Sequence, residues 1–208
     1  TNWTLRKDRS PDPSGGALVL PPWNVNGVCT NAAVAGTVQA TPLPALLRGA
    51  GYRTIHVGKA HFGAVDTPGE DPRNLGFDVN VAGHAAGGPG SYWGEKNFSA
   101  AWRTQPPDHI WDVPGLEAYH GQKINLTEAL TREAIRAVET AVADRQPFYL
   151  YLSHYAVHAP FEADDRFLPA YETAGLKGHA AVYASMIESM DHSLGEVLAA
   201  LKRLGIEQ

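Results

Sequence analysis

The chain has 208 residues, of which 44% are hydrophobic, and its formal net charge is −5. This length is sufficient for one substantial core or two small ones, and no apolar run approaches the roughly 20 residues that span a bilayer. The negative charge argues against nucleic acid as a partner, because such proteins usually carry a basic surface. A single cysteine excludes an internal disulfide and a cysteine-based zinc site.

Residues 1–40 are expected to form an irregular lead-in. Closely spaced prolines and glycines interrupt any period there, and only Ala17–Leu20 has the composition of a short strand. The first residues, Thr1 to Thr4, show no signal-peptide pattern.

The first regular elements are predicted between residues 41 and 82. Thr41-Pro42 is typical of a helix start, with Thr41 as the cap and Pro42 at the first helical position. The apolar face of this helix is expected to contain Leu43, Leu46 and Leu47, and Gly49 or Gly51 ends it. Two strands follow, at Tyr52–Gly58 and Phe77–Ala82.

Residues 83–122 are predicted to form one long loop, because glycines and prolines interrupt the whole stretch. Long ordered loops in compact domains are frequently functional. Tyr92, Trp93, Trp102 and Trp111 add flat aromatic surfaces to this segment. We therefore expect this loop to contact the substrate.

The last third of the chain alternates helices with a strand. Asn125-x-x-Glu128 resembles a capping box and begins a helix that reaches about Asp144, and the strand Phe148–Ser153 follows. The final helix has its apolar residues at Tyr183, Met186, Ile187, Met190, Leu194, Val197, Leu198, Leu201 and Leu204. This alternation predicts an α/β fold with a mostly parallel sheet flanked by helices. A further strand would come next, so we interpret the chain as one piece of a larger α/β domain.

Basic side chains directly follow two of the predicted strands. Lys59 and His61 come after the first strand, and His154 and His158 come after Phe148–Ser153. In α/β proteins, the carboxyl ends of the strands line the ligand crevice. Lysine binds phosphate or sulfate as a point charge, and histidine donates a hydrogen bond or a proton. These strand ends therefore predict an anion site with proton donors beside it.

Each of these residues also has a purely structural interpretation. Lys59 and His61 are compatible with a solvated loop, and His154 with a buried histidine bonded to the backbone. His158 lies nearer the turn at Pro160 and is the better candidate acid. A zinc site formed by His61, His154 and His158 has suitable ligands, but the spacing does not favour it.

Two further histidines follow from the same pattern. His84 lies in a glycine-rich stretch, Gly83–Gly90, whose backbone N–H groups are able to cradle an anion, although a surface loop explains the composition equally well. His56 lies inside its strand and is predicted to be a core residue.

Four segments, in this order, resemble the sulfatases of the alkaline-phosphatase superfamily. They are Leu46–Gly63, which contains the Gly-Lys-x-His-x-Gly pattern, Asn74–Asp78, Gln146–Pro160 and Tyr183–Gly195. Each segment alone is a weak signal, and the ordered set is specific. The resemblance implies that residues 1–208 are the central segment of an arylsulfatase-like catalytic domain with the alkaline-phosphatase-like fold, incomplete in this chain.

The resemblance also implies an activity, the hydrolysis of sulfate esters of carbohydrates or aryl compounds. Family members use a formylglycine hydrate and a calcium ion. By the match, Lys59 would bind a sulfate oxygen, and His61 would contact the formylglycine hydrate and assist sulfate elimination. His158 would contact the sulfate and the leaving-group oxygen as general acid, and His84 would contact the substrate.

The chain also departs from the family pattern. Cys29 does not lie in the Cys/Ser-x-Pro/Ala-x-Arg motif that yields formylglycine, and the paired acidic motifs that bind calcium are missing. We therefore expect no metal ligands in this chain and no turnover by the chain alone. Export to the periplasm or the medium follows from the resemblance only, and nothing in the sequence indicates an oligomeric state.

Two alternatives remain open at the level of sequence. The first is a phosphonate or phosphodiester hydrolase of the same superfamily. The second is a non-catalytic α/β module that binds sulfated glycans through the aromatic loop at residues 83–122.

Overall fold

A computed structural model describes residues 26–207, which form two compact units. The first unit comprises residues 26–87 with Arg145–Ser153, and the second comprises Gly88–Asp144 with residues 154–207. The strand predicted at Ala17–Leu20 lies outside the described residues. None of the described helices is long and apolar enough to cross a membrane.

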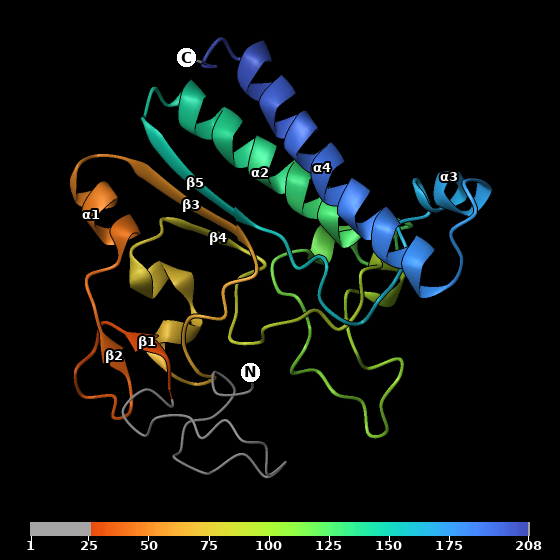
Figure 1. Cartoon of the computed structure of the whole chain (residues 1–208). Coiled ribbons are helices and arrows are strands. Elements are labelled where there is room, and N and C mark those ends of the chain that lie inside the picture. Colours follow the sequence, from red (N-terminus) through yellow and green to blue (C-terminus); the bar gives the residue numbers. More distant parts are fainter. Residues whose placement is uncertain (1–25, 208) are drawn as a thin grey trace. The chain divides into compact units, whose positions relative to one another are not determined.

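The first unit is built on a parallel sheet of three strands. The strand β3 (Arg53–Gly58) lies between β4 (Val79–Val81) and β5 (Phe148–Ser153), as Figure 1 shows. Arg53 pairs with Phe148 and Gly58 pairs with Ser153, so β3 and β5 end level with each other. This sheet confirms the predicted α/β class with parallel strands.

The strand β3 is the centre of this sheet, and every residue after Arg53 is buried. Central parallel strands are covered on both faces, which explains why burial does not alternate along β3. The prediction for β5 matches its observed bounds, and β3 begins one residue later than predicted. The predicted strand Phe77–Ala82 is reduced to the three residues of β4.

The lead-in is more regular than predicted where the structure describes it. The strands β1 (Val28–Cys29) and β2 (Val38–Gln39) form a small parallel pair. The helix α1 (Leu43–Gly49) follows, with Pro42 and not Thr41 at the cap position and no side-chain cap. Its expected apolar face was also wrong, because Leu43 and Leu46 are 54% and 59% exposed and Pro44 is the buried residue of the helix.

An aromatic cluster fills the first unit beside β3. The imidazole of His56 is fully buried and stacks on Tyr151, with Phe62 and Phe77 at its edges. Its Nδ1 lies 3.1 Å from Oδ1 of Asn80. His56 is therefore the core residue that the sequence predicts. Two short 3-10 turns, Pro68–Glu70 and Pro72–Leu75, connect this region to β4.

The described part of the second unit contains three α-helices. Figure 1 shows α2 (Leu126–Ala143) and α4 (His179–Arg203) packed side by side, and α3 (Leu168–Thr173) is a short helix before α4. The Asn125 side chain caps α2 by accepting a 3.0 Å hydrogen bond from the Thr127 amide. The full capping box does not form, because Glu128 instead pairs with Arg132 and Arg166.

The face of α4 that packs inside the unit is only in part the face predicted, since Met186 and Val197 are buried as expected. Small residues are buried along it, namely Ala181, Ser185, Ser189, Ser193 and Ala200, together with Met186 and Val197. Several of the large apolar residues of the predicted face are exposed, namely Tyr183, Ile187, Leu194 and Leu198. Small side chains allow α2 and α4 to approach closely, and Ser193 meets Thr131 at 2.6 Å between their hydroxyl oxygens.

The segment predicted as one long loop is held by its own short turns. Residues Gly94–Lys96 and Glu117–Tyr119 are 3-10 turns, and Trp93 forms an isolated antiparallel bridge with Asn125. Tyr92 and Phe98 are buried. This part of the chain is therefore ordered by hydrophobic anchors although it has almost no regular structure.

Candidate active site

The turn after β3 positions Lys59 at the carboxyl end of the sheet. The Lys59 amide donates a 2.7 Å hydrogen bond to the carbonyl oxygen of Ser153, the last residue of β5. Gly58 has a φ of 106°, and a Cβ at this position would collide with the same carbonyl group. Only glycine allows this approach. Burial lowers the pKa of the Lys59 ammonium group, and an anion bound beside it would compensate for that loss of solvation.

His61 is fixed two residues further along the same turn. Its φ of 56° lies in the left-handed region, which non-glycine residues seldom adopt away from turns and functional sites. Its amide donates a 3.1 Å hydrogen bond to the carbonyl oxygen of His84. A Cβ added at Gly87 would lie 2.5 Å from Cε1 of the His61 ring, so the ring rests directly on the Gly87 backbone.

The first unit therefore brings Lys59, His61 and His84 together at neighbouring strand ends. Lys59 and His61 follow β3, and His84 follows β4, which pairs with β3 in parallel. This grouping agrees with the general rule that ligands bind at the carboxyl ends of parallel strands. The arrangement presents one ammonium group and two imidazoles, which suits an oxyanion and not a cation.

Asn80 supports this region and was not predicted from the sequence. Its Oδ1 faces His56 Nδ1 and accepts a 3.1 Å hydrogen bond from the Gly83 amide, while its Nδ2 donates to the Gly83 carbonyl at 2.9 Å. Asn80 thereby ties the core to the turn that carries His84. Burial lowers the pKa of His56 to about 4 against the opposing effect of Asn80, so this imidazole is neutral near pH 7.

His158 belongs to the second unit, and its ring is exposed. Its Nδ1 lies 2.7 Å from the carbonyl oxygen of Ala159, and since a carbonyl only accepts, Nδ1 carries the hydrogen. The ring rests on Gly88, where a Cβ would lie 2.6 Å from Nδ1. The His158 carbonyl accepts a 2.9 Å hydrogen bond from the Tyr92 hydroxyl. The backbone is thus anchored, and Nε2 is left to exchange a proton.

His154 has a structural role inside the second unit. Its Nε2 lies 2.8 Å from the Ser193 hydroxyl of α4, and burial lowers its pKa to about 4. Among residues 26–207, no group of three or more His, Cys, Asp or Glu side chains is placed to hold a metal ion. The zinc arrangement considered for His61, His154 and His158 is therefore not supported.

The candidate residues do not fit calcium either. Calcium takes six to eight oxygen ligands, whereas Lys59, His61 and His84 offer nitrogen. Cys29 is fully buried, and its sulfur accepts a 3.3 Å hydrogen bond from the Asn31 amide. It is neither exposed nor within the formylglycine motif.

Glu162 is a second residue that the sequence did not predict. Its Oε2 accepts hydrogen bonds from the Ser91 hydroxyl at 2.7 Å and from the Tyr92 amide at 2.6 Å, and its Oε1 pairs with Lys96 at 2.6 Å. Its side chain is only 13% exposed. Glu162 therefore holds the loop at 91–96 to the segment that begins with His158.

Comparison with known proteins identifies the family of this chain. The family model described as Sulfatase matches residues 20–208, so the chain belongs to the sulfatase family. The mouse N-acetylgalactosamine-6-sulfatase is 32% identical over 173 residues, which cover 80% of this chain and 30% of that protein. The arylsulfatase of Klebsiella aerogenes is 28% identical over 184 residues, which cover 82% of this chain and 33% of that protein.

Solved structures show the same relationship. The crystal structure of Ps i-CgsB in complex with k-i-k-neocarrahexaose aligns with 78% of this chain and 36% of its own, with a TM-score of 0.63 and 28% identity. The chain therefore spans about a third of the length of the relatives that it matches.

Proposed function

We propose that the protein containing this chain hydrolyses sulfate esters, and that residues 1–208 form the central segment of its catalytic domain. The observation that carries the proposal is the convergence of Lys59, His61 and His84 at the ends of β3 and β4 in a member of the sulfatase family. Three basic side chains at a sheet edge are suited to bind the three non-bridging oxygens of a sulfate ester.

In this proposal, each residue has a separate role. Hydrolysis breaks the bond between sulfur and the ester oxygen. Negative charge therefore grows on the ester oxygen as it leaves, and a proton must reach it. Lys59 neutralises charge on the non-bridging oxygens, and an interaction of this kind in a partly buried site lowers the barrier substantially. His158 supplies the proton to the leaving oxygen from Nε2, because Nδ1 is already bonded to Ala159. His61 would contact the formylglycine hydrate and assist sulfate elimination, and His84 would contact the substrate.

Formylglycine and calcium enter this proposal through the family alone. The candidate residues Lys59, His61 and His84 do not fit the calcium ion, and Cys29 is not in the formylglycine motif. We infer that a further part of the protein supplies both groups. The greater length of the relatives supports this inference.

A sulfated carbohydrate is the proposed substrate class. The name of the mouse relative and the bound neocarrahexaose of the structural neighbour support this choice. Family membership also supports export of the enzyme to the periplasm or the medium.

Hydrolysis of 4-nitrophenyl sulfate by the full-length protein tests the proposal. Replacing Lys59 with alanine should lower kcat/KM by about 10²- to 10³-fold, the range seen when one charge-stabilising donor is removed. Lys177→Ala is the matched control, because Lys177 is exposed and lies in the second unit. Unchanged turnover in Lys59→Ala would refute the role of Lys59. Faster hydrolysis of bis(4-nitrophenyl) phosphate than of the sulfate ester would favour a phosphodiester hydrolase instead.

A further inference from the structure

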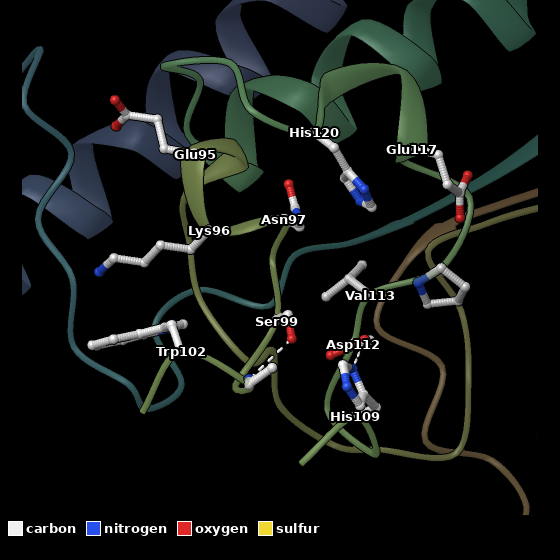
Figure 2. A pocket seen from close by; sticks show the side chains of 12 residues that line it. Glu95, Lys96, Asn97, Ser99, Trp102, His109, Asp112, Val113, Glu117 and His120 are labelled. Atoms are coloured by element: carbon white, nitrogen blue, oxygen red, sulfur yellow. Dashed lines mark hydrogen bonds and ion pairs between the residues drawn. The ribbon is translucent and has the colours of Figure 1, made fainter. Parts of the chain in front are cut away.

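A cavity of about 530 Å³ lies in the second unit within the loop that precedes α2. Its lining comes from residues 95–120, and Figure 2 shows Lys96 and Trp102 on one side with Val113 and Glu117 on the other. Small-molecule sites typically enclose 300–1,000 Å³, so the volume suits a sugar ring or two. Lys59, His61 and His84 belong to the first unit, and His158 is not among the lining residues.

The Lys96 wall of this cavity is held by partly buried contacts. The Lys96 ammonium group lies 4.0 Å from the centre of the Trp102 ring, and it also pairs with Glu162 at 2.6 Å. Glu162 is in turn held by Ser91 and the Tyr92 amide. These contacts fix Lys96 against the indole, while the Trp102 residue remains 52% exposed.

The charges around the cavity disfavour binding of a sulfate group there. Glu162 neutralises Lys96, which is the only Lys or Arg among the lining residues that the structure describes. Glu95, Asp112 and Glu117 contribute three carboxylates, of which Asp112 pairs with His109 at 2.8 Å. A sulfate group placed here would meet net negative charge, which is repulsive at short range.

The remaining chemistry fits a hydroxylated, uncharged ring. Carboxylates and the Asn97 amide accept hydrogen bonds from hydroxyl groups, and the amide also donates. Trp102, Val113 and Pro114 supply apolar surface for the C–H faces of a sugar. We propose that this cavity binds an unsulfated sugar residue of the polysaccharide that the enzyme acts on. This proposal rests on the proposed function, in which the substrate is a sulfated glycan. The sulfated residue itself binds elsewhere.

An array of neutral oligosaccharides, incubated with the full-length protein, tests this site. The array should include uncharged galactose, N-acetylgalactosamine, glucose, mannose, fucose and xylose chains. Binding to at least one neutral chain is expected, and Trp102→Ala and Asp112→Asn should each weaken it at least tenfold. Ile110→Ala is the matched control, since Ile110 is exposed on the same loop but does not line the cavity.

Several results would overturn the proposal. No binding to any neutral chain, binding only to sulfated chains, or neutral binding that survives Trp102→Ala would each do so. The circular dichroism spectra of both variants should match that of the wild type. Matching spectra show that the variants are folded, so a loss of binding is due to the change in the cavity. The probe 4-nitrophenyl sulfate is too small to need this cavity for its hydrolysis. Failure of that reaction therefore contradicts the catalytic proposal, and failure on the neutral array contradicts only this one.

Discussion

The backbone amide of His61 donates a hydrogen bond to the carbonyl oxygen of His84 at 3.1 Å. This bond joins the turn after β3 to the turn after β4, and the ring of His61 rests on Gly87 just beyond. This hydrogen bond and the close contact with Gly87 thus position two candidate site residues, His61 and His84. The position of His61 should therefore be sensitive to changes at Gly87.

Gly87→Ala should reduce activity without unfolding the protein. The added methyl group would lie 2.5 Å from His61 Cε1, so the ring has to move. Misplacement of a catalytic group by about 1 Å is able to lower turnover by about 10²-fold, and we expect a decrease of roughly 10- to 100-fold in kcat/KM for 4-nitrophenyl sulfate. Gly49→Ala is the control, because a Cβ there meets no atom within 4 Å. Equal activity of the two variants would contradict the role of Gly87.

The stability of the fold should fall as the pH is lowered through the titration of His56. Burial lowers the pKa of His56 from its ordinary value of 6.5 to about 4, so the unfolded state binds the proton more readily. The contribution of His56 to the free energy of unfolding is fully present above pH 6.5. It is lost as the pH falls from 6.5 to 4, which lowers the free energy of unfolding by about 3 kcal/mol. Urea unfolding of the full-length protein at pH 7 and pH 4.5 measures the change.

A variant at the same position isolates the contribution of His56. His56→Leu keeps the volume of a buried apolar residue but cannot be protonated. Asn80 would keep its two hydrogen bonds to Gly83, so its amide is not left without a partner. The difference in unfolding free energy between pH 7 and pH 4.5 should be smaller in this variant. An identical difference in both proteins would show that His56 is not the group that titrates.

Ser193→Ala should destabilise the contact between α2 and α4. The Ser193 hydroxyl meets His154 Nε2 at 2.8 Å and Thr131 Oγ1 at 2.6 Å. Its removal leaves a buried imidazole nitrogen without its partner, and such a loss costs about 1–3 kcal/mol. Chemical denaturation measures the loss. Asp191→Ala, at an exposed position two residues earlier on α4, should change stability much less.

Glu162→Gln should loosen the loop at residues 91–96. The neutral amide cannot form the ion pair with Lys96, and its nitrogen cannot accept hydrogen bonds from Ser91 or Tyr92. Limited trypsin digestion should therefore cleave after Lys96 several-fold faster than in the wild type. Glu172→Gln is an exposed control. Equal rates in the two variants would mean that Glu162 does not order the loop.

The strands at the candidate site were predictable because their signals are local. The strands β3 and β5 are short runs of β-branched and aromatic residues that end abruptly, and parallel pairing then aligns their ends. The same reasoning predicts that Lys59 and His61 lie at the carboxyl end of the sheet. Their assigned roles, and that of His158 as an acid, stay predictions.

Other features depend on contacts that sequence patterns do not carry. The Glu162 carboxylate accepts a hydrogen bond from Ser91, which lies 71 residues earlier, and no local pattern marks such a pair. The packed face of α4 was predicted only in part, because hydrophobicity patterns favour large apolar residues, whereas this face also uses serine and alanine. Close approach between helices selects for size and not for apolar character.

The exposed side chains of α4 have a practical consequence for purification. Tyr183, Ile187, Leu194 and Leu198 leave an apolar strip facing solvent. Strips of this kind promote self-association when nothing covers them. Preparations of these 208 residues by themselves should scatter light increasingly with concentration, and charged replacements at Leu194 and Leu198 should keep the samples clear.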